Sequence, residues 1–339
     1  MTTDAGTVTP GAIWSVVYGY TAYWTVVAAI RLGIFDRLAD GPLTLPELGT
    51  ACDAPPDRLV SVAGALVAIG LLDGDQSGYR LTDNAAAFLI AGGDRYMGEL
   101  VVRSPGPPDN WPVLAETLRG ASPPVSLDPT SFFVPLVRAT FPTQYAVACR
   151  TIDLIGPADV RAVLDVGTGA APWSVALLQA HPDATATLND LPEVLPEAER
   201  MAAAHHVADR CRLLPGDYHA TDLGKDTYDT VVLGHVVRTE GPDLAPVLIA
   251  RAARALRVGG TLILSDYFVD DDQRGPLQSL LLGVTMIANT DEGTTFTHAQ
   301  YHRWLEDAGC SDIQLLEPLP FTHVLVARKH SSSNRKEAP

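Results

Sequence analysis

The stretch VLDVGTGAAPWS, residues Val163–Ser174, decides the fold expected for this chain. An apolar strand containing Asp165 leads into a turn with two glycines, Gly167 and Gly169, and a helix follows the turn. Glycines let a ligand approach the backbone closely, and the amino end of a helix favours a negative group. The spacing of a full dinucleotide motif is missing, so this turn alone is a weak signal.

The next two expected strands strengthen that signal. Asp190 ends the stretch ATATLND, where a carboxylate can accept hydrogen bonds from both hydroxyls of a ribose. One strand later, Asp217 can bind the amino group of an adenine, and Tyr218 can cover its ring. Each residue alone could be an ordinary loop or turn residue. Together they converge on one crevice of an open α/β sheet, which favours a ligand that contains adenosine.

Residues 158–329 alternate between strand and helix patterns, which predicts a mostly parallel sheet covered by helices on both faces. The seven expected strands are AVLDVG, ATATLND, CRLLPGD, YDTVVLG, GTLILSD, DIQLLEP and HVLVARK. Only a short segment joins the last two strands, and it contains Pro318 and Pro320. A connection this short requires an antiparallel pair at the edge of the sheet.

The N-terminal part, residues 12–95, reads as mainly helical. Helices are expected over TVVAAIRLGIFDRLAD, over TLPELGTACDAP with a capping box at Thr44 and Glu47, and over PPDRLVSVAGALVAIGLL. A small hairpin with its turn at residues 74–78 follows. This order is typical of a winged-helix module, and its role is either dimerisation or DNA binding. Dimerisation is favoured, because the helix PPDRLVSVAGALVAIGLL is mostly apolar or small and lacks the set of Arg, Lys, Asn and Gln side chains that reads bases.

Composition excludes several classes of protein. The 339 residues have a net charge of −16, which argues against a nucleic-acid partner. The four cysteines are far apart, which argues against disulfides and zinc knuckles and fits the cytoplasm; no metal site is expected. No signal peptide is evident, and the apolar stretch 14–30 reads as a packed helix rather than a membrane span. Residues 1–11 and the tail 330–339 are expected to be disordered.

The chain resembles the S-adenosylmethionine-dependent O-methyltransferases of small-molecule metabolism. The resemblance covers residues 12–329 and includes the segments RLVSVAGALVAIGLL, VLDVGTGAAPWSVALLQAHPDATATLNDLPEVL, YDTVVLGHVV and ARALRVGGTLILSD. It implies a seven-stranded, mostly parallel Rossmann-like sheet in residues 158–329. It also implies a winged-helix-like dimerisation domain in residues 12–95 and helices that line the acceptor pocket in residues 96–157. A homodimer through the N-terminal domain, with a small-molecule acceptor, is therefore expected.

The resemblance also assigns roles around the cofactor. The Gly167–Gly169 turn would cradle the methionine end of S-adenosylmethionine, with Asp165 near its amino group. Asp190 and the adjacent Leu191 would hold the ribose, and Asp217 with Tyr218 would hold the adenine. Gly234 and His235 would lie beside the sulfonium.

The catalytic position departs from the family pattern. Members usually have VLHDW after the fourth strand, and its histidine removes the proton from the acceptor hydroxyl. The aligned segment here is Val236–Glu240, with Arg238 in the place of the histidine. A guanidinium, with a pKa above about 12, is no base near neutral pH. Arg238 and His235 are the candidate catalytic residues, although His235 is expected to face the cofactor.

Three hypotheses follow for this position. In the first, the protein methylates an acceptor that is already anionic, and Arg238 stabilises the anion while catalysis rests on proximity. In the second, the cofactor is bound but the reaction is a cyclisation, decarboxylation or hydroxylation. In the third, the protein is a non-catalytic partner or a regulator. The set of cofactor residues favours an enzyme, and methyl transfer is the leading hypothesis.

The acceptor pocket is expected between the glycine-rich edge of the sheet and the helices 132–155 and 277–290. Apolar and aromatic linings suit a flat, polyketide-type acceptor. The candidate lining residues are Trp111, Phe133, Phe141, Tyr145, Leu282, Met286 and Asn289. Several of them are equally compatible with core or dimer contacts. Glu240 and Asp243 are interpreted as acids at the amino end of a helix, with a favourable effect on its dipole.

Overall fold

The computed structural model describes residues 9–93, 95–156, 159–320 and 322–330. The chain divides into two compact units between Val102 and Arg103. The predicted disorder of residues 1–8 and 331–339 lies outside the described residues. Gly11, expected to belong to the disordered start, already begins the first helix.

The N-terminal unit contains helices followed by a two-stranded hairpin, in the predicted order. Its elements are α1 (Gly11–Arg31), α2 (Ile34–Arg37), α3 (Leu45–Ala51), α4 (Pro56–Ile69), β1 (Leu72–Asp75), β2 (Gly78–Leu81) and α5 (Asp83–Phe88); α6 (Gly98–Arg103) ends at the division between the units. The predicted capping box is present, since the Thr44 side chain accepts from the Glu47 amide and Glu47 accepts from the Thr44 amide.

The predicted continuous helix over residues 25–40 is wrong. Helix α1 ends at Arg31, and Gly33 adopts a left-handed conformation with φ of +69° before α2 begins. A single glycine in this conformation ends a helix without steric cost, and this outweighs the apolar periodicity that continues beyond it.

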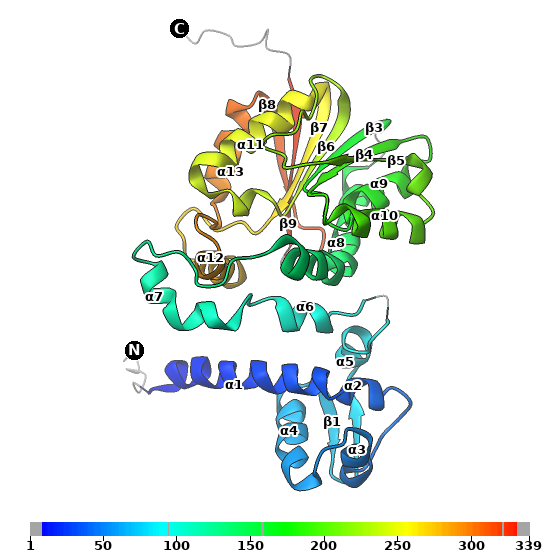
Figure 1. Cartoon of the computed structure of the whole chain (residues 1–339), viewed down its shortest axis with the longest axis vertical. Helices are drawn as coiled ribbons and strands as arrows, with labels where there is room; N and C mark the ends of the chain where they lie inside the picture. Colours follow the sequence, from blue (N-terminus) through cyan, green and yellow to red (C-terminus); the bar gives the residue numbers. More distant parts are fainter. Residues whose placement is uncertain (1–8, 94, 157–158, 321, 331–339) are drawn as a thin grey trace, which may run out of the picture. The chain divides into compact units, whose positions relative to one another are not determined.

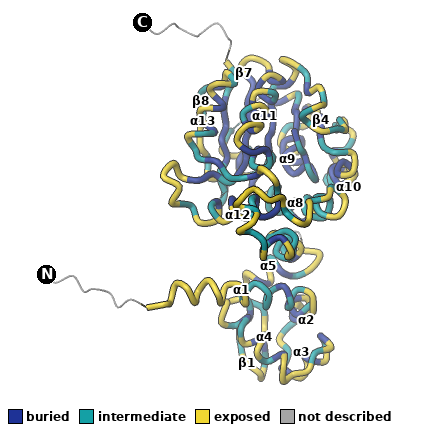
Figure 2. Tube along the Cα trace, turned by 60° about the vertical axis from the view of Figure 1, so that its left-hand side comes forward, coloured by how far each residue is buried: buried dark blue, intermediate teal, exposed yellow. Residues whose placement is uncertain are grey.

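The first half of helix α1, residues 11–21, is exposed (Figure 2), whereas Val27 and Ala29 in its second half are buried. Its exposed apolar side chains include Ile13, Trp14, Val16, Val17, Tyr18 and Tyr20. Among the described residues it is the helix long and apolar enough to cross a membrane by length and composition, which is weak evidence on its own. A row of exposed aromatic and branched side chains is also what a protein–protein interface requires.

The C-terminal unit is built around a seven-stranded sheet. Its strands are β3 (Ala162–Val166), β4 (Thr185–Asp190), β5 (Cys211–Pro215), β6 (Tyr228–Gly234), β7 (Leu256–Asp266), β8 (Cys310–Leu316) and β9 (His323–Lys329). They lie in the order β5-β4-β3-β6-β7-β9-β8, with β9 antiparallel to both β7 and β8. The predicted antiparallel pair at the sheet edge is confirmed.

Helices cover both faces of this sheet (Figure 1). One face packs on α8 (Val134–Ile155), α9 (Pro172–Ala180) and α10 (Leu195–Ala204), with Trp173 and Leu178 deep in the core. The other face packs on α11 (Gly241–Ala255) and α13 (His298–Asp307), around Phe268 and Tyr301. The remaining helices are η1 (Pro108–Val113), α7 (Leu114–Thr117), η2 (Pro129–Phe133), η3 (Ala208–Arg210), η4 (Val237–Thr239) and α12 (Leu277–Asn289).

The strand order reverses at β3, which pairs with β4 on one side and β6 on the other. The register aligns the carboxyl ends, because Val166 pairs with both Asn189 and Leu233, and Gly234 pairs with Ser265. A reversal of this kind opens a crevice at the carboxyl edge of a parallel sheet. The predicted ligand residues follow the strands that border this crevice.

Candidate functional site

The glycine turn between β3 and α9 is a close-packed backbone cradle. Gly167 has φ of +62° and Gly169 has φ of +58°, in the region that other residues rarely adopt. A Cβ added to Gly167 would lie 2.4 Å from Val236, and one added to Gly169 would lie 3.1 Å from Val137. Only glycine fits both the conformation and the space, so this turn is built for close backbone approach.

Asp165 lies near the end of β3, just before the glycine turn. Its carboxylate is only 1% exposed and accepts a 2.7 Å hydrogen bond from the Ser174 hydroxyl in the first part of α9. Burial raises its pKa to about 6, against the opposing effect of the hydrogen bonds from Ser174 and Thr168. The Asp165 carboxylate is enclosed by protein atoms and presents no open surface to a ligand. Its contact with the amino group of the cofactor therefore stays a prediction.

Asp190 lies at the end of β4, against the glycine turn. Its carboxylate accepts hydrogen bonds from the amides of Gly169, at 2.7 Å, and Leu191, at 2.8 Å. Burial raises its pKa, while these two amides oppose the shift. Each amide occupies a different oxygen, so each oxygen keeps a further acceptor position, as two ribose hydroxyls require.

Asp217 and Tyr218 follow β5 at the same edge of the sheet. Asp217 is exposed and accepts from the His219 amide at 2.8 Å. The Tyr218 ring lies beside the turn, 3.7 Å from the position of a Cβ on Gly167. Burial, then the nearby charge of Glu240, raises the pKa of the Tyr218 hydroxyl, so it stays protonated as a hydrogen-bond donor.

Glu240 has a different role from the one predicted. It is at the N-cap of α11, but its side chain makes no capping hydrogen bond. The carboxylate is buried and instead contacts the Tyr218 hydroxyl and the His219 ring. The interpretation as a plain helix-terminal acid was wrong, because the loop after β5 approaches it with two donors.

His235 follows β6 in a left-handed conformation, with φ of +62°. Non-glycine residues in this region store strain and cluster at functional sites. Its Nδ1 is buried without a hydrogen-bond partner, and its Nε2 lies 3.4 Å from the Ser265 hydroxyl. Burial, aided by the positive charge of Arg238, lowers the pKa of His235 to about 4, so the ring is neutral at physiological pH.

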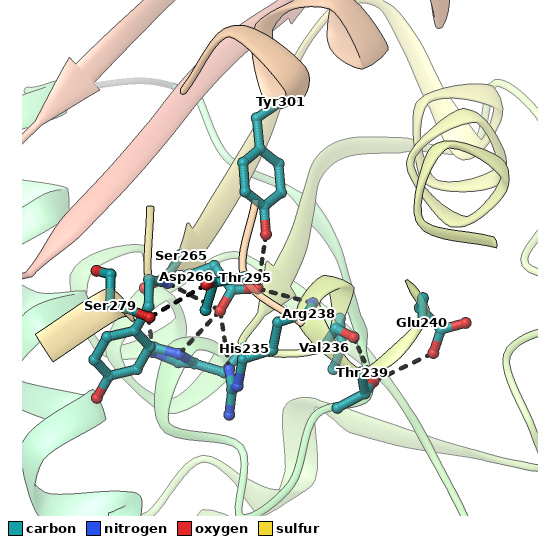
Figure 3. A network of polar contacts seen from close by, with 11 residues as sticks. His235, Val236, Arg238, Thr239, Glu240, Ser265, Asp266, Ser279, Thr295 and Tyr301 are labelled. Atoms are coloured by element: carbon teal, nitrogen blue, oxygen red, sulfur yellow. Dashed lines mark hydrogen bonds and ion pairs between the residues drawn. The ribbon is translucent and has the colours of Figure 1, made fainter. Parts of the chain in front are cut away.

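Arg238 lies in η4 and is held by a buried carboxylate, Asp266, at the end of β7. The Arg238 backbone amide and Nη1 both donate to it, at 3.1 Å and 3.0 Å. The guanidinium lies 5.8 Å from the centre of the Tyr267 ring, and Nε is buried without a partner. Figure 3 shows Asp266 at the centre of this network, with Tyr301 also donating to it at 3.2 Å.

Asp266 was not among the residues predicted from the sequence. The available signal was the one that identified Asp190, an acid that directly ends an apolar strand, here GTLILSD. Because Asp266 is only 3% exposed and accepts four hydrogen bonds, it is a fixed negative charge that orients Arg238.

Two predicted acceptor-lining residues are engaged elsewhere. Phe141 is only 5% exposed and stacks on Tyr145, in the core that α8 forms with α9 and α10. The Asn289 amide is buried and bonded to Asn110, Pro105 and Thr285. Their contact with the acceptor stays a prediction, because sequence periodicity does not show which neighbour fills a helix face.

The other candidates have varied surroundings. The Tyr145 hydroxyl donates to Gln179, and the Trp111 ring nitrogen donates to the Pro105 carbonyl. Phe133 and Leu282 are half-buried. Met286 lies beside the segment that holds Arg238, since a Cβ on Gly293 would meet both its methyl group and the Arg238 carbonyl.

A cavity of about 350 Å³ lies next to the segment that contains Arg238. Its lining includes Ile287, Gly293 and Thr294, and the Thr294 amide donates to the Arg238 carbonyl at 2.9 Å. Within the part of the chain that the structure describes, no three His, Cys, Asp or Glu side chains gather as metal ligands.

Comparison with known proteins shows the same organisation. The sequence model of the O-methyltransferase domain matches residues 142–311, and that of the O-methyltransferase dimerisation domain matches residues 14–91. A 3-hydroxy-5-methyl-1-naphthoate 3-O-methyltransferase from Streptomyces sahachiroi is 30% identical, over 87% of this chain and 88% of the relative. The tetracenomycin polyketide synthesis 8-O-methyl transferase TcmO from Streptomyces glaucescens is 29% identical, over 90% and 92%.

Human N-acetylserotonin methyltransferase, solved with S-adenosylmethionine, has the same fold, with a TM-score of 0.81 at 21% identity over 97% of this chain and all of that one. The fold and the matches define an S-adenosylmethionine-dependent methyltransferase. The chain belongs to the O-methyltransferase family whose members have an N-terminal dimerisation domain.

The residues at the carboxyl edge fit the cofactor chemically. The glycine turn is free of side chains of its own, and Asp190, which lies against it, offers two carboxylate oxygens to a diol. The buried ring nitrogen of Trp173, close to Gly234, has no hydrogen-bond partner among the described residues. When bound, S-adenosylmethionine supplies an electrophilic methyl group, and the glycine turn and Asp190 are the predicted residues that would hold it.

Asp190→Ala should weaken the binding of S-adenosylhomocysteine by about 1–3 kcal/mol, because charge-assisted hydrogen bonds to the ribose are lost. Titration calorimetry on the folded variant measures this. Asp183→Ala is the control, since Asp183 is exposed near the other end of β4. Unchanged affinity in Asp190→Ala would remove this residue from the cofactor site.

The variant His235→Asn tests whether the buried imidazole of His235 is neutral at physiological pH. The folded-state pKa of about 4 lies below the ordinary value of 6.5, so the histidine contributes stability above pH 6.5 that is lost as pH falls towards 4. Asparagine tolerates the left-handed backbone and does not titrate. The free energy of unfolding of the wild type, minus that of the variant, should therefore rise by roughly 3 kcal/mol from pH 4 to pH 7.

Urea unfolding at a series of pH values measures this difference. The exposed His302, paired only with Glu306 on the surface of α13, provides the control variant His302→Asn. A constant difference between wild type and His235→Asn across the pH range would show that His235 titrates normally.

Proposed function

We propose that this chain transfers the methyl group of S-adenosylmethionine to an oxygen of an aromatic or polyketide-type small molecule, and that the acceptor oxygen reacts as an anion held by Arg238. The observation that carries the proposal is the state of the two candidate catalytic residues. Arg238 is a fixed cation, and His235, with a pKa of about 4, is a very weak base.

Proton removal by His235 is unfavourable for an ordinary phenol. A phenol with a pKa of about 10 would have to lose its proton to an imidazole whose pKa is about six units lower. An acidic phenol or an enolate needs no base near neutral pH. Its ionised oxygen can approach the methyl group directly, so that catalysis depends on proximity and on stabilisation of the anion.

Arg238 suits this role because only part of its hydrogen-bonding capacity is used. Nη1 is committed to Asp266, while Nε has no partner among the described residues. The guanidinium is fixed by the Asp266 carboxylate and by the Tyr267 ring, so little side-chain entropy is lost when an anion binds. Asp266 thus orients Arg238, and Arg238 orients the acceptor.

The nature of the acceptor is supported by the relatives. The name of one bacterial relative gives an aromatic naphthoate as its acceptor, and the name of the other places it in tetracenomycin polyketide synthesis. Half-buried Phe133 and Leu282, with buried Met286, are the proposed apolar contacts. The matches to methyltransferases do not favour the alternatives of a non-methylating enzyme or a regulator.

We also propose a cytoplasmic homodimer formed through the N-terminal unit. The dimerisation-domain match supports this, as does the exposed apolar surface of α1. An interface of this composition would bury Trp14 and Tyr18, which are 51% and 63% exposed in the single chain.

Arg238→Gln tests the acceptor role, because glutamine can still donate to Asp266 but carries no charge. The variant should lower kcat roughly ten- to hundredfold while leaving S-adenosylhomocysteine affinity unchanged. Hydroxynaphthoates and phenols of different acidity serve as acceptors. Mass spectrometry follows the gain of one methylene unit together with S-adenosylhomocysteine formation.

In the wild type, the pH at which the rate reaches half its maximum should move with the pKa of the acceptor. The exposed Arg274 provides the control variant Arg274→Ala. Wild-type turnover by Arg238→Gln, or a pH midpoint that stays the same for every acceptor, would contradict the proposal.

Trp14→Asp should convert the dimer to a monomer, because a charge cannot be buried in an apolar interface without a partner. Size-exclusion chromatography with light scattering should give twice 36.1 kDa for the wild type and 36.1 kDa for the variant. Val258→Asp, at an equally exposed apolar position in the other unit, should remain dimeric. A wild-type monomer at micromolar concentration would refute the dimer.

A further inference from the structure

Glu240 connects two loops at the carboxyl edge of the sheet. Its side chain is 6% exposed, and both carboxylate oxygens are used. Oε1 accepts from the Tyr218 hydroxyl, while Oε2 contacts Nε2 of His219. Tyr218 and His219 belong to the loop that follows β5, whereas Glu240 ends the loop that contains Arg238.

The Tyr218 ring depends on this connection for its position. The ring is placed beside Gly167, where its edge approaches the turn that cradles the cofactor. The atom that approaches the turn is Cε1, which is bonded to the carbon that carries the hydroxyl, and the hydroxyl itself contacts Glu240. The carboxylate therefore fixes the end of the half-buried ring that lies beside Gly167.

The same carboxylate also meets the short helix η4. The Thr239 hydroxyl lies 3.3 Å from Glu240 Oε1 and 2.6 Å from the Val236 carbonyl, as Figure 3 shows. The side chain of Val236 also lies against Gly167, where it limits the space above that glycine. Tyr218 and Val236 therefore flank the same glycine, and Glu240 links the segments from which both project.

We propose that Glu240 is a positioning residue for the cofactor, which acts by holding the Tyr218 ring against the Gly167 turn. It does not need to touch the cofactor itself. Its removal would leave the tyrosine hydroxyl and the His219 ring without their shared partner, and the loop after β5 would lose its connection to the loop that contains Arg238.

The chemistry of the pair explains why a carboxylate is effective here. A charged acceptor forms hydrogen bonds that are shorter and stronger than those of a neutral one. The raised pKa of Tyr218 keeps its proton available over the physiological range. The ring is therefore fixed before the ligand arrives, which reduces the entropy lost on binding.

Glu240→Ala should weaken S-adenosylhomocysteine binding about tenfold, as expected for the loss of a charge-assisted hydrogen bond that fixes the ring. Glu240→Gln should largely restore affinity, because its carbonyl oxygen can accept from Tyr218. In steady-state kinetics, Glu240→Ala should raise KM for S-adenosylmethionine more than it lowers kcat.

The double variant tests whether Glu240 acts through the tyrosine. Tyr218→Phe keeps the ring and removes the hydroxyl, so it should weaken binding several-fold. In combination with Glu240→Ala it should cause little further loss. Multiplicative effects of the two substitutions would overturn the proposal, because they would show independent actions.

A merely structural role would behave differently. Asp229→Ala is the matched control, since Asp229 lies at the other end of β6 and its carboxylate accepts from the amides of Arg161 and Ala162. It should lower Tm without changing S-adenosylhomocysteine affinity. If Glu240→Ala also lowers only Tm, the proposal fails.

This inference rests on the proposed cofactor residues, and the variants separate the two. If Asp190→Ala weakens binding and Glu240→Ala does not, the cofactor site stands and only the positioning role is lost. If neither weakens binding, the cofactor assignment itself is wrong.

Discussion

The close packing at Gly167 is the constraint on which the site depends. The residue has a left-handed backbone, and Val236 occupies the space that any side chain would need. This packing joins the end of β3 to the loop after β6, at the point where the strand order reverses. The crevice exists because parallel strands end together there and their connections diverge to opposite faces of the sheet.

Two buried carboxylates fix the loop that follows β6. Asp266 holds Arg238 through both its backbone and its guanidinium, and Glu240 holds the end of the loop against Tyr218. Buried charges persist only where several hydrogen bonds compensate for their desolvation. Both carboxylates meet that condition, so the loop between them has a defined geometry although it contains only a short helix.

Much of this architecture followed from local patterns. Apolar runs predicted all seven strands, and the acids and glycines near their ends lie together at the carboxyl edge of the sheet. The sequence did not show which neighbours a helix side chain meets. Asn289 bonds to Asn110, 179 positions away, whereas Phe141 stacks on Tyr145 of the same helix. At Gly33 the left-handed backbone separates α1 from α2, although the apolar periodicity continues through it.

The sequence by itself determined the fold class and the cofactor, because strand periodicity, glycine turns and residue identity are local properties. Only the tertiary structure decided what holds Arg238 and Tyr218 in place. The pairing of Arg238 with Asp266 joins residues 28 positions apart, and that of Tyr218 with Glu240 joins residues 22 positions apart. Burial of these pairs fixes the orientation of their side chains. That burial depends on packing between strands and loops that are not adjacent in the chain.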